Sequence, residues 1–131
     1  MTKGCPFCNI AENDSANRII EQNDLGFVIR DGYPISKGHT LIIPKRHVDS
    51  FFEITDKEHK ALFSLLDSTK VILHREFKPS SYNIGINDGA EAGQTVPHLH
   101  IHLIPRYKGD IEDPRGGVRW VIPDKAKYWE D

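Results

Sequence analysis

The stretch 98-HLHIHLIP-105 alternates histidine with aliphatic residues. Successive side chains of a β-strand point to opposite faces, so His98, His100 and His102 are predicted to share one face and the aliphatic side chains the other. The chain has 7 histidines, and this stretch holds three of them. Because the imidazole pKa lies near neutrality, such a row suits nucleophilic attack, proton transfer or metal binding. The pattern therefore predicts a strand that is buried on one face and carries chemistry on the other.

The rest of the chain predicts further strands and one long helix around this row. The helix is expected over residues 55–77, where Thr55-x-x-Glu58 has the form of a capping box. Short strands are expected over 18–21, 26–30, 40–44, 81–87 and 98–105, and a short helical turn over 5–12. One long helix beside several sequential strands indicates an α+β fold with an antiparallel sheet.

Length and composition favour one ordinary globular domain over residues 1–131, with residues 106–131 as a C-terminal extension of undefined structure. The formal net charge of -2 argues against a general nucleic-acid-binding surface. No apolar run approaches the roughly 18 residues of a membrane span. The N-terminus also lacks the apolar core of a signal peptide, so a cytoplasmic location is expected.

The spacing of the histidines limits what they can do together. Cα atoms two residues apart on a strand are separated by about 6.7 Å, and those four apart by about 13 Å. Two neighbouring imidazoles can share a metal ion, but three on one regular strand cannot easily do so. The row suits a linear substrate lying along it. The alternatives are a polar, wet strand face and a metalloenzyme that uses one His-x-His pair.

Cys5 and Cys8 form a C-x-x-C pair. In a reducing compartment this spacing favours metal binding or redox chemistry over a structural disulfide. The segment is similar to the glutaredoxin motif, but only four residues precede Cys5, which is too few for the strand that motif follows. A closed zinc site needs two ligands besides these thiolates. Two packed thiols without a ligand are the alternative.

The row and three companion segments resemble the histidine triad (HIT) family. At every position, His98–Ile104 matches the family signature, in which apolar residues separate three histidines. The companions follow the family order over roughly residues 5–105, and they are 38-GHTLIIPKRH-47, 87-NDG-89 and 93-GQT-95. The resemblance implies a HIT-like fold, with an antiparallel sheet of about five strands, one long helix and a short N-terminal helix.

The resemblance implies a nucleotidyl hydrolase or transferase that acts on the α-phosphate of a purine nucleotide derivative. His100 would be the nucleophile that forms a histidine–NMP intermediate, and His102 would bind the phosphoryl oxygens. A dinucleoside polyphosphate is slightly favoured as substrate, because basic residues follow the triad. An adenosine phosphoramidate is the alternative substrate, and a non-catalytic nucleotide-binding protein is the alternative function. A homodimer is also implied.

The same resemblance assigns nucleotide contacts. Asp31 would accept hydrogen bonds from the ribose hydroxyls, and Asn87 would lie near the junction of ribose and phosphate. Gln94 and Thr95 would contact the phosphate and the leaving group, and Gly93 would let the backbone approach closely. Plain turn or loop roles are the alternative for each of these residues.

In some branches of the family a cysteine pair binds zinc together with two histidines. The matching residues here are Cys5, Cys8, His47 and His98, and a closed set of four ligands makes this zinc structural. A zinc-dependent redox or metalloenzyme built on the two cysteines is a third functional class.

The remaining polar features are weaker signals. Arg106, Lys108, Arg115 and Arg119 give the tail locally basic positions, which could meet outer phosphates, with Trp120 stacked on a second adenosine. A solvated tail that packs on a partner subunit is the alternative. His39 is predicted to be a structural hydrogen-bonding residue. His59 and His74 are predicted to lie on the solvated face of the helix.

Overall fold

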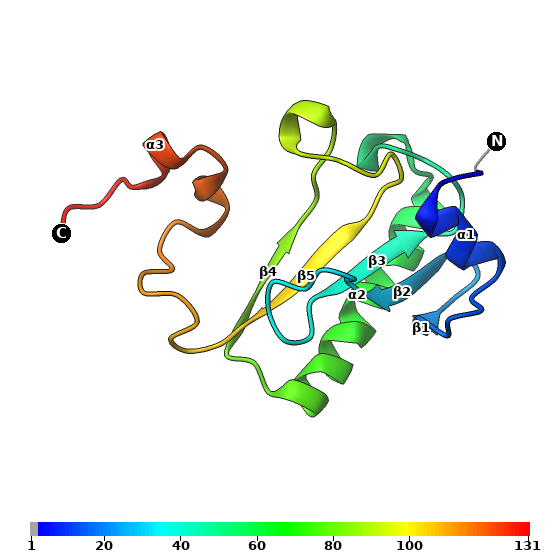
Figure 1. Cartoon of the computed structure of the whole chain (residues 1–131), viewed down its shortest axis with the longest axis horizontal. Helices are drawn as coiled ribbons and strands as arrows, with labels where there is room; N and C mark the ends of the chain where they lie inside the picture. The colour runs from blue at the N-terminus through cyan, green and yellow to red at the C-terminus, as the bar shows by residue number, and fades with distance from the viewer. Residues whose placement is uncertain (1–2) are drawn as a thin grey trace.

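The computed structural model describes residues 3–131, so that Met1 and Thr2 lie outside the described range. It is built on one antiparallel sheet of five strands in the order β1-β2-β3-β5-β4 (Figure 1). The strands are β1 Ile19–Gln22, β2 Gly26–Arg30, β3 Thr40–Pro44, β4 Ser81–Gly85 and β5 Ile101–Arg106. The expected α+β class and five-stranded sheet are confirmed.

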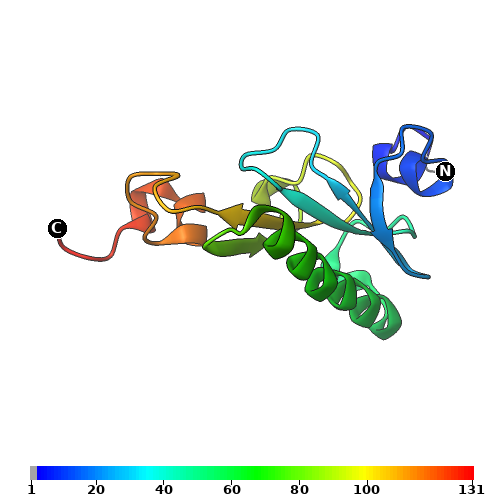
Figure 2. The same ribbon diagram turned by 90° about the horizontal axis from the view of Figure 1, so that it is seen from below.

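One face of the sheet is covered by the long helix α2, Asp56–Phe77 (Figure 2). Both hydrogen bonds of the predicted capping box between Thr55 and Glu58 are present at its start. The helix ends where Lys78 adopts a left-handed conformation with a φ of 52°. Its apolar stripe packs against the aliphatic residues that alternate with the histidines, in a core that includes Leu62, Leu65, Leu73, Leu99, Ile101 and Leu103.

The strand that carries the histidines starts later than predicted, at Ile101 instead of His98. Its ladder with β3 pairs Ile42 with Ile101 and goes no further. The next residues of β3 lead to Pro44, which has no N–H to donate, and the Pro44 carbonyl oxygen accepts instead from the His98 side chain. The strand expected over 81–87 is also shorter and ends at Gly85. The alternation itself persists, because Leu99 is buried in the same core as Ile101.

The opposite face of the sheet receives the short helix α1, Pro6–Glu12, near its β1–β2–β3 side. Cys5 caps the helix by accepting a hydrogen bond at Sγ from the Cys8 amide at 3.4 Å, and Pro6 occupies the first helical position. Both cysteines and Phe7 are buried in a second core with Phe27, Ile29, Leu41 and Ile43. The N-terminal segment is thereby held over the sheet, next to the histidine row.

Three short 3-10 helices lie in the connections, at Phe51–Glu53, Ala90–Ala92 and Gly117–Val121. The last of these and helix α3, Pro123–Ala126, belong to the tail, which extends beyond the β4 edge of the sheet (Figures 1 and 2). Of the described helices, none is both long and apolar enough to cross a membrane.

The basic residues of the tail mostly contact the tail itself. Arg106 pairs with Asp110, and Arg115 pairs with Asp113. Arg119 donates to the carbonyl oxygens of Lys125 and Ala126. Three of the four cations expected to be available for outer phosphates are therefore engaged inside the tail.

Candidate functional site

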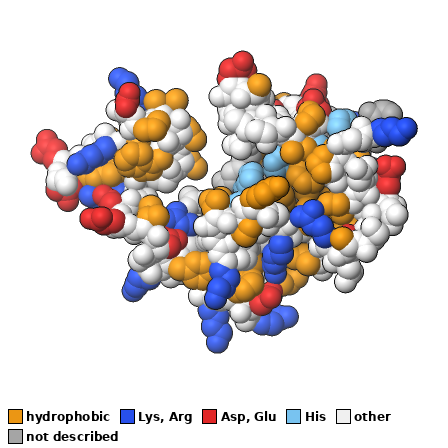
Figure 3. All heavy atoms as spheres, in the orientation of Figure 1, with side chains coloured by type: hydrophobic (Ala, Val, Ile, Leu, Met, Phe, Trp, Pro, Cys, Tyr) orange, Lys and Arg blue, Asp and Glu red, His pale blue; other side chains and the backbone are white. Residues whose placement is uncertain are grey.

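A cavity of about 590 Å³ opens on the face of the sheet opposite α2. Its lining includes His39, His100 and His102, and in Figure 3 histidine side chains lie in a hollow bordered by hydrophobic residues. Phe7 from α1 packs edge-on against His100, with ring centroids 5.0 Å apart. The second and third histidines of the row thus face one cavity, whereas His98 is fully buried.

The tautomer of His100 follows from its hydrogen bond. Its Nδ1 lies 2.8 Å from the main-chain oxygen of His98. A carbonyl oxygen can only accept, so Nδ1 carries the proton and Nε2 of the neutral ring keeps its lone pair. With the residue 9% exposed, this nitrogen is the nucleophilic atom of a nearly buried imidazole at the cavity wall. An imidazole held in this way is ready to attack an electrophile.

His102 is oriented by a chain of hydrogen bonds that starts at the backbone. The Ile35 amide donates to Nδ1 of His39 at 3.2 Å, so the proton of the neutral His39 ring lies on Nε2. That nitrogen is 2.9 Å from Nδ1 of His102 and 3.3 Å from Oδ2 of Asp31. His102 therefore accepts at Nδ1 and carries its own proton on Nε2. The chain makes His102 a neutral hydrogen-bond donor in the cavity, and it confirms His39 as a hydrogen-bonding residue.

Burial keeps His102 neutral. The pKa of His102 is lowered to about 4, chiefly by burial and to a smaller extent by the neighbouring rings of His100 and His39, while Asp31 acts in the opposite direction. The pKa of His39 is also lowered, chiefly by burial, again with Asp31 opposing the shift. At neutral pH both rings are uncharged and the tautomers described above apply.

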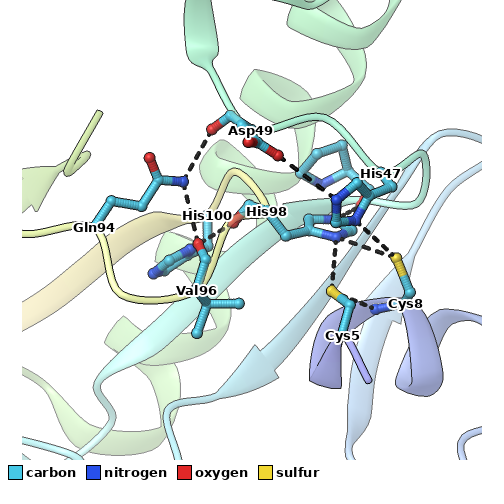
Figure 4. Close-up of polar contacts among 9 residues, drawn as sticks. Cys5, Cys8, His47, Asp49, Gln94, Val96, His98 and His100 are labelled. Carbon is cyan, nitrogen blue, oxygen red and sulfur yellow. Dashed lines mark hydrogen bonds and ion pairs between the residues drawn. The ribbon is translucent and has the colours of Figure 1, made fainter. Parts of the chain in front are cut away.

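Four residues from three parts of the chain meet beside the cavity, and their ligand atoms all lie within 4.8 Å of one another (Figure 4). Nδ1 of His98 is 3.4 Å from each of the Sγ atoms of Cys5 and Cys8, and Nδ1 of His47 is 3.2 Å from Cys8 Sγ. Ligand atoms around one tetrahedral zinc ion are separated by about 3.3–3.8 Å, given the usual Zn–S and Zn–N lengths. The cluster therefore fits a tetrahedral metal ion.

His98 joins the two sites. Its Nε2–H donates to the Pro44 carbonyl oxygen at 2.8 Å, which leaves the Nδ1 lone pair directed at the thiols. Its main-chain oxygen accepts from Nδ1–H of His100. On the other side of the cluster, the Asp49 carboxylate lies near His47, with Oδ1 3.6 Å from Nε2. The four-residue Cys/His cluster and the imidazole of His100 are thus connected through one residue.

The structure brings most of the residues expected to contact a nucleotide to the cavity. Asp31, Asn87, Gly93 and Thr95 line it, and Gly93 has a φ of 98°, which favours glycine. Gln94 does not line it. Its side-chain amide holds the loop instead, accepting from the Gly89 amide and donating to the carbonyl oxygens of Asp49 and Val96.

Several lining residues were not predicted as site residues, and Arg18 and Phe7 are among them. Arg18 stands immediately before β1, far in sequence from every motif, and no local pattern marks it. Phe7 lies within the C-x-x-C pair, so its place beside the histidines could have been inferred from the zinc ligand set that joins α1 to His98. His59 and His74 are exposed on α2, as predicted.

Comparison with known proteins leads to the same family as the sequence motifs. The HIT domain family matches residues 12–109. The chain is 37% identical to the Protein hit of Bacillus subtilis over 109 residues, which are 82% of this chain and 75% of that protein. It is 44% identical over 80 residues to a bis(5'-nucleosyl)-tetraphosphatase (asymmetrical) of Schizosaccharomyces pombe, and 35% identical over 110 residues to an adenylylsulfatase of Arabidopsis thaliana. These matches cover 61% and 84% of this chain, but only 44% and 56% of the two enzymes.

Solved structures of this family have the same fold as this chain. A HIT family protein from Bacillus subtilis superposes with a TM-score of 0.77 at 34% identity, covering 82% of this chain and 77% of that one. A zinc-bound histidine triad family protein from Mycobacterium smegmatis superposes with a TM-score of 0.75 at 27% identity, covering 100% and 85%. On the fold, the ordered motifs and these matches, the chain belongs to the histidine triad (HIT) family.

Proposed function

We propose that this protein is a nucleotidyl hydrolase that attacks the α-phosphorus of a purine nucleotide derivative and releases the nucleoside monophosphate. The observation that carries the proposal is the state of His100, whose protonated Nδ1 is held by the His98 carbonyl oxygen while Nε2 keeps its lone pair. Binding alone does not require a nucleophile at the cavity wall, so this feature favours catalysis over a non-catalytic nucleotide-binding role.

The reaction proceeds in two displacements. Nε2 of His100 bonds to the α-phosphorus while the bond to the leaving group breaks, which gives a nucleotidyl-histidine. Nδ1 keeps its proton, so the substituted ring is positively charged and the His98 carbonyl oxygen stabilises it. Water then attacks phosphorus, the P–N bond breaks, and the ring returns to its neutral state. The proton that water loses balances the one that the leaving group acquires.

His102 and the loop residues serve the transferring phosphate. Nε2–H of His102, set by the chain from Ile35 through His39, donates to a phosphoryl oxygen on which negative charge increases. Asp31 binds the ribose hydroxyls, and Asn87 lies at the ribose–phosphate junction. Thr95 contacts the phosphate, while Gln94 acts by shaping the loop that carries Thr95.

The leaving group separates two substrate classes. The fission-yeast relative is a tetraphosphatase and the Arabidopsis relative an adenylylsulfatase, so relatives differ on this side of the phosphorus. The basic tail favoured dinucleoside polyphosphates, but Arg106, Arg115 and Arg119 are engaged with tail residues. We therefore propose dinucleoside polyphosphates and nucleoside phosphoramidates as equally supported substrates.

The last part of the proposal concerns the four-residue Cys/His cluster beside the cavity. Zinc held by Cys5, Cys8, His47 and His98 would cross-link the N-terminal segment to the chain that supports His100. All four positions are protein ligands, so the metal is structural. We further propose, from family membership, that the protein acts as a homodimer. The cytoplasmic location expected from the sequence stays a proposal of its own.

The test is a panel of dinucleoside polyphosphates and adenosine phosphoramidates compared by kcat/KM. His100→Ala should lower kcat at least about 1,000-fold while AMP binding stays measurable. His74→Ala removes an exposed histidine on α2 and serves as the matched control. Wild-type protein that is mixed with substrate and quenched in alkaline denaturant should carry a nucleotidyl adduct, detected by intact-protein mass spectrometry. The His100 variant should carry none. Full activity of His100→Ala together with dependence on an exchangeable metal would favour a metalloenzyme instead.

A further inference from the structure

The cavity extends across the sheet in an order that matches the parts of a nucleotide. His102 lies on β5 and His100 immediately before it, Asp31 follows β2, and Arg18 precedes β1 at the sheet edge. Ribose lies between the base and the α-phosphate in any nucleotide. With phosphorus at His100 and ribose at Asp31, the base extends past β2 to the edge where Arg18 lies. This placement rests on the proposed function.

Arg18 is held in place at that edge. Both carboxylate oxygens of Asp14 accept backbone hydrogen bonds, one from the Arg18 amide at 2.7 Å and one from the Ile19 amide at 2.8 Å. The guanidinium Nη2 donates to the Arg30 carbonyl oxygen at 3.1 Å. A Cβ built on Gly32 would lie 3.7 Å from the same Nη2, so the guanidinium borders the turn that carries Asp31.

Arg18 also differs from most other arginines in having no carboxylate partner among residues 3–131. Its single hydrogen bond from the side chain goes to a carbonyl oxygen, although the residue is half-buried in the cavity wall. Four other arginines form ion pairs with acidic side chains, namely Arg30, Arg46, Arg106 and Arg115. A guanidinium has five N–H donors, so Arg18 keeps donors for a ligand.

These donors discriminate between purines. A guanidinium fork matches two adjacent acceptors, and guanine presents O6 and N7 side by side. Adenine presents N7 beside its N6 amino group, which is itself a donor and opposes a second N–H. We propose that Arg18 selects the base in this cavity and that the protein prefers guanine nucleotides to adenine nucleotides.

The decisive experiment compares GMP and AMP by titration calorimetry on the full chain. Wild-type protein should bind GMP about tenfold more tightly than AMP or better, the effect of one good bidentate contact. Arg18→Met keeps an unbranched stem without donors, so it should bring the two affinities close together, mainly by weakening GMP. Arg18→Lys keeps the charge but loses the fork, and it should also lose most of the preference. Arg75→Met, at an exposed position on α2, should retain it.

The outcomes separate this inference from the proposed function. Equal binding of GMP and AMP by wild type overturns the assignment of Arg18, and so does a preference that persists in Arg18→Met. An equal loss of both affinities in Arg18→Met also overturns it, because stacking on the base or general support of the cavity gives that result. Failure of the wild type to bind or hydrolyse any nucleotide overturns the proposed function and this inference with it. Circular dichroism of both variants checks that they fold.

Discussion

The protein contains two clusters in which histidine side chains lie close to thiols or to a carboxylate. The clusters differ in which ring nitrogens of their histidines carry protons. In the metal cluster, formed by Cys5, Cys8, His47 and His98, the His98 proton is drawn away to Pro44 and a lone pair points at the thiols. In the relay cluster, formed by Asp31, His39 and His102, a proton lies between the two imidazoles. The ligand atoms of each group lie within 4.8 Å of one another.

The comparison shows that proximity alone does not make a metal site. The Ile35 amide occupies Nδ1 of His39 and thereby keeps the proton of this ring on Nε2, the nitrogen that a metal in the relay cluster would need. The relay cluster is therefore suited to pass a fixed orientation to His102, whereas the metal cluster is suited to bind an ion. Three experiments test this division.

Removal of a thiolate should have the largest effect. Metal analysis of the wild-type protein should return about one zinc per chain, and Cys5→Ser should lose it. We expect the free energy of unfolding to fall by at least about 3 kcal/mol, because metal binding contributes directly to folding energy. Denaturant titration with and without a chelator measures this. A variant that keeps its zinc and its stability would contradict the assignment of the metal cluster.

Substitution of His39 should separate the two clusters. His39→Ala should leave the zinc content at about one per chain but lower kcat about 10- to 100-fold, less than loss of a direct oxyanion donor. His39→Gln retains an N–H near the position of Nε2, so it should recover much of the lost kcat. A second equivalent of zinc in the wild type that disappears in His39→Ala would show that the relay cluster is a metal site after all.

The pH dependence of stability should show the smallest effect. The pKa of His102 is lowered to about 4 in the folded chain, against about 6.5 when unfolded. Between these values the unfolded chain binds more protons, so stability falls as the pH falls from 6.5 towards 4. From pH 7 to pH 5 the wild type should lose about 2 kcal/mol more than His102→Gln. Because both proteins contain the metal cluster, acid loss of zinc cancels in the difference, and equal losses would contradict the burial of a neutral His102.

The fold was largely predictable because its signals are local. The capping box at Thr55, the buried strand that ends at Pro44 and the alternation after His98 each occupy a few adjacent residues. The errors arose where distant groups compete. The start of β5 moved to Ile101 because Pro44 cannot continue the ladder, and that proline lies 54 residues from His98, which binds its carbonyl oxygen.

The kinds of residue at the site were predictable, but their hydrogen-bond partners were only partly so. The cluster of Cys5, Cys8, His47 and His98 was expected from the family resemblance, and the four residues come together as expected. His100, the expected nucleophile, lines the cavity. Gln94 was expected at the phosphate and instead braces the loop, since its amide can reach three backbone groups at once. The tail arginines were expected to be available to ligands, but nearby carboxylates and carbonyl oxygens engage them.

The sequence by itself determined the five strands, the helices α1 and α2, the family and the kinds of side chain at the site, because periodicity and motif spacing are properties of adjacent residues. Tertiary structure decided which nitrogen of His98 and of His102 carries a proton. His39 meets His102 across 63 residues, and Cys5 meets His98 across 93. His98 and His102 owe their proton positions to partners that only folding brings near, whereas His100 is held by the main-chain oxygen of His98, two residues away. These distant partners give similar histidines of one row different hydrogen-bonding states.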